Sequence, residues 1–389
     1  MKKIIFVINN LETGGVQKSL LNLLNEIHND YDITLLTFFG NDYTEKLIPS
    51  NVKIIKPQGP FRQLGLSVIH TANKPFLYIK RAFWITLTKM FGRSFALKLM
   101  CLFRKKHKGY DVAVSFIHEA NQKSLYGGCN EYVLKIIDAK QKIGWLHCDF
   151  ERSGANNAVS KKIYKELDTI VACSDGCKKS FIKCMPEYAD KTFTVRNCND
   201  YGQIVSLASE DIKYDSDYFN IVTVARLSKE KALDRALTAI SNAINAGYKI
   251  KYRVVGDGDQ KDFLASKVRE LKLEDHVIFY GNKQNPYPYI KAADLFLLTS
   301  YHEAAPMVFD ESACLGVPVL STETTSTDEM IVSANAGYVC KNSQEDINDA
   351  LLNILANQSE LTKIRDDLKK RSFTNKNSTA ALDEILNRS

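Results

Sequence analysis

The 389-residue sequence lacks any apolar run close to the roughly 20 residues that a transmembrane helix needs. It opens with Met1, Lys2 and Lys3, and the apolar run that follows is already interrupted by polar Asn9. This run is too short for the core of a signal peptide, so it predicts a buried first strand. We therefore expect a cytoplasmic protein.

Paired cysteine motifs are also lacking. The nine cysteines form an odd set without a C-x-x-C pair, which favours free thiols in a reducing compartment over a disulfide framework. No spacing of histidine, cysteine and acidic residues matches a zinc site, and neither a P-loop nor a G-x-S-x-G serine motif occurs. The sequence therefore predicts no metal requirement and no bound cofactor.

Acidic residues are missing from a long part of the first half, although the net charge is only +7. No Asp or Glu lies between Glu45 and Asp111, and residues 74–108 hold ten Lys or Arg among aromatic and aliphatic side chains. Such a basic, amphipathic stretch is typical of a helix on an anionic membrane surface, which is the interpretation we favour. Two alternatives stay open: helices packed on the first domain with solvated lysines, and a nucleic-acid patch, for which no recognition motif is present.

Strand-like and helix-like segments alternate along the chain, which favours parallel sheets flanked by helices. In the first half, strands are predicted at 3–9, 32–39, 52–55, 112–116, 142–147, 169–173 and 193–195. In the second half, they are predicted at 220–224, 251–256, 277–280, 295–298, 318–321 and 337–339. The predicted fold class is α/β, with two doubly wound parallel-sheet domains that face each other across a central cleft.

The domain boundaries follow from chain length and from one polar interval. A chain of this length favours two domains, each with its own core. We predict an N-terminal domain over 1–198, a linker over 199–218, a second domain over 219–370 and a C-terminal helix over 371–389. The N-terminal domain is the expected packing partner of that last helix.

Two glutamates with seven residues between them, Glu303 and Glu311, follow the predicted strand 295–298. Pro306 lies between them, before a helix-like run from Met307 to Leu315, and proline suits a first helical turn. A helix N-terminus offers unpaired N–H groups and a positive dipole end to an anion. With a carboxylate on either side to bind hydroxyls, this arrangement fits a nucleotide-sugar. Taken alone, such a pair is more often a loop cap and a solvated helix residue, because exposed charge is the norm.

Cations and glycines follow three other predicted strands. Arg226 and Lys231 come after strand 220–224, where Arg can bind two phosphate oxygens and Lys acts as a point charge. By position alone they fit a solvated surface equally well. Gly14 and Gly15 follow the first strand and either admit a ligand to the backbone or form a plain tight turn. Gly256 ends strand 251–256 without the third glycine of a dinucleotide fingerprint.

His147 closes the predicted strand 142–147, at the end where a first-domain strand would meet the cleft. A histidine in that place is as often a structural residue as part of a site. No side chain of the sequence is an evident nucleophile, and none is assigned that role.

Taken together, these motifs resemble the retaining glycosyltransferases of family 4, which have two Rossmann-like domains and an open cleft between them (the GT-B fold). The resemblance is densest over 219–340. It rests on Val224-Ala225-Arg226-Leu227 with Glu230-Lys231, Val254-Val255-Gly256-Asp257-Gly258, Tyr280-Gly281-Asn282, Ala293-Asp294-Leu295, Ser300-x-x-Glu303, the gap to Glu311, and Gly316-Val317-Pro318-Val319. The first half is similar only more loosely, through Gly14-Gly15, Trp145-Leu146-His147 and Asn197.

The resemblance implies transfer of a sugar from a nucleotide-diphosphate donor to a hydroxyl of a glycan or lipid-linked acceptor, in cell-surface polysaccharide biosynthesis. The N-terminal domain would bind the acceptor, and the second domain would bind the donor. The protein would be peripherally attached to the inner face of the plasma membrane. Arg226 and Lys231 would neutralise the diphosphate, Glu303 would bind the transferred sugar and Glu311 the ribose, with His147 at the reacting sugar. The implied catalytic residues are His147, Arg226, Lys231 and Glu303. The implied donor-binding residues are Gly14, Gly15, Arg226, Lys231, Gly256, Glu303, Ala305, Pro306, Met307, Val308 and Glu311.

The chain departs from the family pattern at Ala232, where glycine is usual, and at Ala304-Ala305, where Gly-Phe or Gly-Leu is frequent. Neither change removes a charge, so the shape of the sugar pocket is what they affect.

Two other functions stay open. A nucleotide-sugar epimerase of the same fold would need no acceptor platform, and a non-catalytic sugar-nucleotide-binding partner would be favoured only if Arg226, Lys231 or Glu303 were missing.

Overall fold

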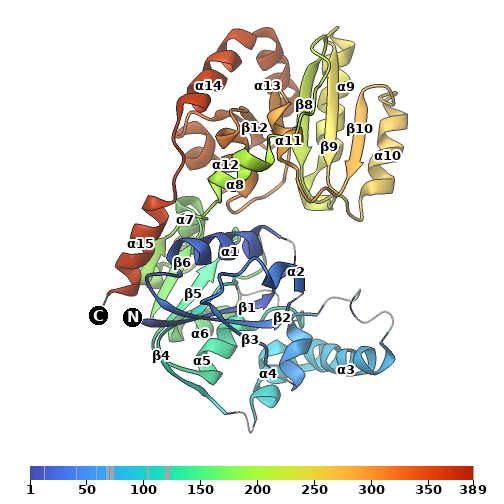
Figure 1. Ribbon diagram of the computed structural model, residues 1–389. Coiled ribbons are helices and arrows are strands. Elements are labelled where there is room, and N and C mark those ends of the chain that lie inside the picture. Colours follow the sequence, from blue (N-terminus) through green and yellow to red (C-terminus); the bar gives the residue numbers. More distant parts are fainter. Residues whose placement is uncertain are drawn as a thin grey trace. The chain divides into compact units, whose positions relative to one another are not determined.

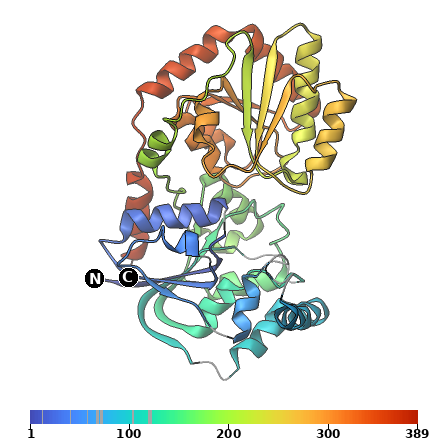
Figure 2. The same cartoon turned by 45° about the vertical axis from the view of Figure 1, so that its right-hand side comes forward.

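The computed structural model describes residues 1–12, 14–40, 42–57, 59–66, 70, 74–102, 105–118 and 123–388. The chain divides into two compact units. Unit 1 comprises Met1–Cys198 and Asn375–Ser389, and unit 2 comprises Asn199–Thr374. Each unit is a parallel sheet with helices on both faces (Figures 1 and 2). The predicted fold class, two doubly wound α/β domains, is confirmed.

Within the described residues, the sheet of unit 1 has the strand order β3-β2-β1-β4-β5-β6-β7, and all its strands are parallel. The strands are β1 (Lys3–Asn10), β2 (Asp32–Phe39), β3 (Lys53–Ile55), β4 (His107–Ser115), β5 (Ile137–Leu146), β6 (Thr169–Ala172) and β7 (Thr192–Thr194). The order runs outward from β1 in one direction and from β4 in the other. In such a sheet, ligands bind outside the carboxyl ends of the strands at this switch point.

The helices of unit 1 are α1 (Gly15–Ile27), α2 (Asp42–Glu45), η1 (Gly59–Leu64), α3 (Pro75–Phe91), α4 (Arg93–Cys101), α5 (Cys129–Ile136), α6 (Ala158–Glu166), α7 (Asp175–Cys184), η3 (Pro186–Lys191) and α15 (Lys376–Leu386). Alternate residues of β1 face opposite sides of the sheet, as the period of a strand requires. Ile4 and Phe6 pack with α1 and α15, whereas Ile5 and Val7 pack with α4 and α5.

The C-terminal helix α15 belongs to unit 1 and lies beside α1 (Figure 1). Its residues Leu382 and Ile385 are buried in the core below α1. Asn375 Nδ2, just before the helix, donates to Glu26 Oε1 at 2.7 Å, and Gln141 Nε2 of β5 donates to the Ile385 carbonyl at 3.3 Å. The helix is therefore held by both apolar packing and specific hydrogen bonds.

The described part of unit 2 contains a second parallel sheet, in the order β10-β9-β8-β11-β12-β13. Its strands are β8 (Phe219–Val224), β9 (Ile250–Val255), β10 (Val277–Gly281), β11 (Leu295–Leu298), β12 (Val319–Thr322) and β13 (Gly337–Cys340). Its helices are α8 (Tyr201–Leu207), η4 (Lys229–Lys231), α9 (Leu233–Asn245), α10 (Lys261–Glu270), α11 (Tyr287–Lys291), α12 (Met307–Cys314), the π-helical turn η5 (Asp328–Val332), α13 (Gln344–Ala356) and α14 (Gln358–Lys370).

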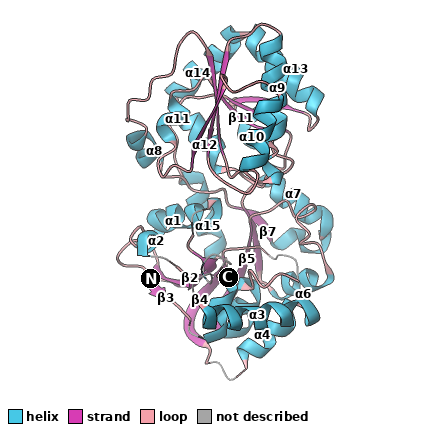
Figure 3. Cartoon of the chain, turned by 90° about the vertical axis from the view of Figure 1, so that its right-hand side faces the viewer, coloured by secondary structure: helices cyan, strands magenta, loops and turns pink. Residues whose placement is uncertain are grey.

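Both faces of this second sheet are covered, as Figure 3 shows with strands in magenta and helices in cyan. Leu295 and Leu297 of β11 pack with α9, α10 and α13, whereas Phe296 and Leu298 pack with α8, α11 and α12. The continuous apolar run of β11 reflects this burial on both sides. The switch point of unit 2 lies between β8 and β11.

The predicted linker over 199–218 is wrong in the structure, because these residues fold as part of unit 2. They form α8, whose Ile204 is buried in the core together with Ala208. The Tyr214 hydroxyl donates to the Tyr289 carbonyl at 3.1 Å, and the Arg253 guanidinium lies 3.6 Å from the centre of the Tyr214 ring. A helix of two turns shows too few inward apolar residues for its period to be recognised.

Candidate active site

The switch point of unit 2 brings together two of the segments that carry predicted site residues. The loop after β8 carries Arg226 and the short helix η4, which ends at Lys231. The loop after β11 carries Glu303 and leads into α12. Because β8 and β11 are adjacent and parallel, both loops leave the same edge of the sheet. This is where an open parallel sheet places its ligand.

An ion pair joins these two loops. Lys231 Nζ lies 2.5 Å from Glu303 Oε1, and the Ser300 hydroxyl donates to the same oxygen at 2.6 Å. The Glu303 side chain is 11% exposed and the Lys231 side chain 22% exposed. A charge-assisted pair of this length, largely withdrawn from water, holds both side chains in fixed positions.

Backbone contacts hold the same loops in register. The Tyr301 amide donates to the Glu230 carbonyl at 2.9 Å, and the Thr299 hydroxyl donates to the Ala232 carbonyl at 2.9 Å. Ala232 has a left-handed backbone, with φ 48° and ψ 46°. An L-residue with a Cβ pays roughly 1–2 kcal/mol for this conformation, and glycine avoids that cost. The structure thus explains physically why glycine would suit this position better than alanine.

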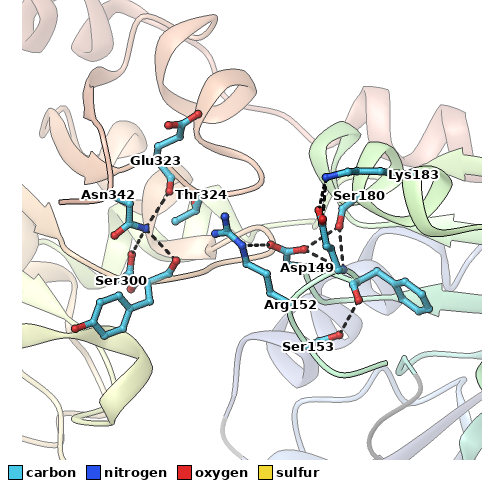
Figure 4. Close-up of polar contacts among 12 residues, drawn as sticks. Asp149, Arg152, Ser153, Ser180, Lys183, Ser300, Glu323, Thr324 and Asn342 are labelled. Atoms are coloured by element: carbon cyan, nitrogen blue, oxygen red, sulfur yellow. Dashed lines mark hydrogen bonds and ion pairs between the residues drawn. The ribbon is translucent and has the colours of Figure 1, made fainter. Parts of the chain in front are cut away.

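A second layer of polar side chains supports the loop after β11 (Figure 4). Asn342 Nδ2 donates to the Tyr301 carbonyl at 3.0 Å and, at 3.3 Å each, to the carbonyls of Ser300 and Glu323. Arg235 Nη1 donates to Asn342 Oδ1 at 2.6 Å, and its guanidinium lies 4.9 Å from the centre of the Tyr301 ring. Sequence analysis missed both residues. The available signal was the position of Asn342 just beyond a predicted strand.

Arg226 is exposed at the carboxyl end of β8. Burial raises the pKa of the neighbouring Glu230 carboxyl, but local hydrogen bonds and the charges of Arg226 and Lys231 outweigh burial, so the pKa lies below its ordinary value. The positive fields of Arg226 and Lys231 therefore act on the same part of the loop. This is the electrostatic setting that a diphosphate requires.

The helix α12 begins where the sequence placed it. Pro306 stands at the N-cap with an extended backbone, just outside the first turn, and the Phe309 amide donates to its carbonyl at 3.1 Å. Met307 is buried, whereas Val308 and Ala305 are partly exposed. Glu311 is only 3% exposed, so the alternative of a solvated helix residue is wrong. Its side chain is buried at the second turn of α12.

Gly256 is required by packing between two loops of the protein. Its φ is +144°, and a Cβ there would lie 1.9 Å from the Ala225 carbonyl oxygen. The Leu227 amide donates to the Asp257 carbonyl at 3.0 Å, and a Cβ on Gly258 would lie 2.2 Å from the Leu227 carbonyl oxygen. The loop after β9 is thus pressed against the loop that carries Arg226.

Gly256→Ala is expected to destabilise unit 2 without touching a charged group of the site. The forbidden backbone alone costs about 1–3 kcal/mol, and the overlap with Ala225 adds to this. Thermal unfolding followed by circular dichroism should show a clear loss in Tm. Gly202→Ala is the matched control, because a Cβ there would meet only Asp200 Oδ1 at an ordinary 3.7 Å, and its Tm should not fall. Equal Tm values for the two variants would contradict the packing argument.

The glycine pair of unit 1 has no comparable packing constraint. Gly14 is the N-cap of α1 with an extended backbone, and a Cβ there would meet the flexible amide of Gln17. Gly15 has no atom within 4 Å of a built Cβ. Gln17 Nε2 in turn donates to Asn10 Oδ1 at 2.9 Å, at the carboxyl end of β1. The structure leaves both readings of the pair open, a turn or an approach to a ligand.

His147 lies directly after β5 in unit 1, among aromatic rings. It is parallel to Trp145 with the ring centres 6.1 Å apart, and its centre lies 4.8 Å from that of Phe116. Burial and the charge of His118 lower the pKa of His147 to about 3, and burial and the charge of Arg93 lower the pKa of His118 to about 4. Both imidazoles are therefore neutral at neutral pH.

His118 is a second histidine that sequence analysis missed. It follows β4, one strand from His147 and next to the switch point of unit 1. Neither His118 Nδ1 nor His147 Nε2 has a hydrogen-bond partner within the described structure. The loop beyond His147 is fixed by Asp149, whose Oδ1 accepts from the Ser180 hydroxyl at 2.8 Å (Figure 4). The signal that could have revealed His118 was its place after a predicted strand.

Comparison with known proteins finds a family match within unit 2. Residues 208–373, nearly all of unit 2, match the family of glycosyl transferases group 1. Together with the two parallel-sheet domains, this match supports a glycosyltransferase of the GT-B fold.

Several particular proteins are similar to the chain. An N-acetylgalactosamine-N,N'-diacetylbacillosaminyl-diphospho-undecaprenol 4-alpha-N-acetylgalactosaminyltransferase of Campylobacter jejuni is 22% identical over 98% of this chain and 95% of that protein. An uncharacterized glycosyltransferase of Methanocaldococcus jannaschii is 24% identical over 42% of this chain, and the aligned part spans only 41% of that protein. Among solved structures, Anabaena HepE in complex with UDP has a TM-score of 0.68 and 16% identity, with 99% of both chains covered. At that identity the structural likeness shows the fold.

Proposed function

We propose that the protein is a retaining glycosyltransferase that moves a sugar from a nucleotide-diphosphate donor to a hydroxyl of a glycan or lipid-linked acceptor, in polysaccharide biosynthesis. The observation that carries the proposal is the Lys231–Glu303 ion pair at the switch point of unit 2. It is supported by the family match over residues 208–373 and by the Campylobacter relative, whose name includes a diphospho-undecaprenol. The Anabaena structure holds UDP, which adds support for a nucleotide-sugar donor.

In this proposal the charge of Lys231 is balanced by a carboxylate of the protein before the donor binds. Lys231 is paired with Glu303, and Ser300 orients the same carboxylate. A bound diphosphate gives Lys231 a second anionic partner, and Arg226 can bind two phosphate oxygens at once. Glu303 then accepts hydrogen bonds from hydroxyls of the transferred sugar. The positive charge comes from side chains, so the reaction needs no metal ion.

The first turn of α12 completes the donor site. Backbone N–H groups at Met307 and Val308 face a phosphate or sugar oxygen at the positive end of the helix dipole. Ala305 and Pro306, which precede the helix, line the same part of the donor site. Glu311, one turn further on, binds the ribose hydroxyls. Because its carboxylate is almost fully buried, little conformational freedom is lost when the ribose binds.

Departure of the nucleotide places negative charge on the β-phosphate while the sugar becomes oxocarbenium-like. Arg226, Lys231 and the N-terminus of α12 meet the first change as fixed positive charges, which is the largest source of catalysis in such reactions. We assign no protein nucleophile. The proposed role of His147 in the reaction is that of a neutral hydrogen-bonding group, since its lowered pKa excludes a charged imidazolium at neutral pH.

Glu311→Gln should raise the KM for the donor by about tenfold, because a charged hydrogen bond to ribose hydroxyls is lost. Turnover should change only a few-fold, since ribose contacts form equally in the ground state and the transition state. Steady-state kinetics over a donor series measure both quantities, and a thermal melt checks that the buried substitution leaves the fold intact. A larger loss in kcat than in donor affinity would show that Glu311 acts on the reacting sugar instead.

The function is tested by measuring nucleotide release from a panel of UDP- and GDP-sugars, with and without a lipid-linked acceptor and with and without EDTA. The proposal predicts acceptor-dependent release that EDTA does not abolish, and a product whose anomeric configuration by NMR is that of the donor. Inversion would contradict the retaining mechanism alone. Conversion of the nucleotide-sugar in the absence of acceptor would favour the epimerase alternative, and binding without turnover would favour a non-catalytic partner.

A further inference from the structure

The helix α3 of unit 1 has two different apolar faces. On the inner face, Trp84 and Ile85 pack against the core, Thr88 is fully buried and Arg81 Nη1 donates to the Gln63 carbonyl at 3.0 Å. The outer face carries a stripe at helical spacing, which we name the α3 stripe: Phe76, Ile79, Phe83 and Met90. These side chains are 70%, 64%, 59% and 69% exposed. Packing on unit 1 therefore accounts for only one of the two faces.

The exposed apolar surface continues from α3 onto α4, which follows it after a single residue (Figure 1). The rings of Phe91 and Phe95 lie 5.2 Å apart, and Phe95 and Leu99 of α4 are both exposed. Contiguous apolar surface of this kind marks an interaction site in a soluble protein. The alternative of packed helices with merely solvated lysines explains the inner face of α3 and leaves this surface without a function.

Exposed lysines accompany the stripe. Lys80 and Lys89 of α3 and Lys98 of α4 are all exposed, and Lys80 Nζ lies 4.4 Å from the centre of the Phe76 ring. In the described structure none of these three lysines forms an ion pair with a carboxylate, and the sequence has no acidic residue from 46 to 110. Lysine is depleted in protein–protein interfaces, whereas lysine around an apolar stripe suits anionic headgroups.

We propose that α3 lies flat on an anionic lipid bilayer, with the α3 stripe at the headgroup–acyl boundary and Lys80, Lys89 and Lys98 among the headgroups. Among the described residues, no helix is both long enough and apolar enough to cross a bilayer. The proposal goes beyond the proposed function, because it rests on α3 and α4 alone and holds whatever the donor is. Phe103 and Arg104, which fall in the stretch 74–108 predicted from sequence, lie outside the described residues.

The apolar part is tested by sedimentation with vesicles of phosphatidylcholine and phosphatidylglycerol at low salt. The wild-type protein should enter the pellet. The triple variant Ile79→Ser, Phe83→Ser, Met90→Ser should bind at least about tenfold more weakly, because it removes three apolar side chains from the inserted face. The matched control is Val205→Ser, Phe263→Ser, Val332→Ser in unit 2, whose parent side chains are 53%, 51% and 54% exposed. This control should sediment like the wild-type protein.

The charged part is tested with a second pair of triple variants. Lys80→Gln, Lys89→Gln, Lys98→Gln should abolish the preference for vesicles with phosphatidylglycerol over vesicles of phosphatidylcholine alone. The control, Lys161→Gln, Lys162→Gln, Lys165→Gln on α6, removes the same charge from exposed lysines elsewhere in unit 1 and should keep that preference. Binding of the wild-type protein should also weaken as salt rises, because salt screens the headgroup charge.

Three results would overturn the proposal. The first is a wild-type protein that stays in the supernatant with anionic vesicles at low salt. The second is equal binding of the two lysine variants, which would mean attraction by net charge without a specific surface. The third is a dimer in sedimentation velocity that the serine variant of the α3 stripe dissolves, because the stripe would then be an interface between copies. None of these readouts requires enzymatic activity, so a failure here leaves the donor site untouched.

Discussion

Lys231→Ala is expected to lower turnover by roughly 10²–10³-fold, the usual loss when one preorganised charge that stabilises a transition state is removed. The physical reason is the leaving diphosphate, whose growing negative charge Lys231 would meet from a fixed position beside Glu303. The fold should persist, because Ser300 still donates to Glu303 after the change. Initial rates of nucleotide release at saturating donor measure the effect, and a thermal melt checks the fold.

Lys229→Ala is the matched control for this prediction. Lys229 begins the same short helix that Lys231 ends, and its side chain is exposed. Loss of this charge should change turnover only a few-fold, since exposed charges are screened by water. If Lys231→Ala were as active as Lys229→Ala, the role of Lys231 at the diphosphate would have to be abandoned.

Glu303→Gln is expected to lower kcat by about 10²-fold or more, with a smaller change in the KM for the donor, because hydrogen bonds to the sugar tighten as positive charge develops on it. The amide keeps the size of the side chain, so the measured loss reports the charge. Glu311→Gln should show the opposite pattern, with donor affinity reduced more than turnover. The reverse ordering of the two variants would mean that their roles are exchanged.

The Lys231–Glu303 ion pair also predicts how a variant with both residues replaced should behave. Residues in direct contact give non-additive effects, and Lys231 and Glu303 are in contact. The variant Lys231→Ala, Glu303→Gln should therefore be less impaired than the product of the two single effects. Strict additivity would indicate that the pair is not maintained in the active protein.

The sequence allowed the strands to be predicted because each one is a short apolar run between turn residues. The strand Leu295–Leu298 has the predicted bounds, since all of its residues are buried. The strands β4 and β5 begin earlier than predicted, at His107 and Ile137, because their first halves carry polar residues that extend beyond the core. Periodicity detects the buried part of a strand and is silent about the exposed part.

The candidate site was predictable to the extent that strand ends locate it. Arg226, Lys231 and Glu303 could be placed in one site because they follow strands of one parallel sheet. The pairing of Lys231 with Glu303 required the strand order, in which β8 and β11 are neighbours. Arg235 and Asn342 could not be predicted, because they are far apart in sequence and meet only through the fold.

Two further features depend on three-dimensional packing. Gly256 is among the donor-binding residues implied by the resemblance, and its φ and the nearby Ala225 carbonyl show in addition that the protein's own backbone requires glycine there. The stretch 74–108 was recognisable as basic and apolar, but only the structure separates Trp84, which packs inward, from Phe83, which is exposed. The spacing of apolar and charged residues indicates that a helix is amphipathic, but it does not show which face of the helix is covered by the rest of the protein.

The most direct test of the central claim, a nucleotide-diphosphate site at the switch point of unit 2, is calorimetric titration with UDP and with GDP. The account predicts that one of them binds the wild-type protein and Lys229→Ala equally well, and binds Lys231→Ala at least about tenfold more weakly because a charged contact is lost. Equal binding to Lys231→Ala and the wild-type protein, or no binding of either nucleotide, would contradict it.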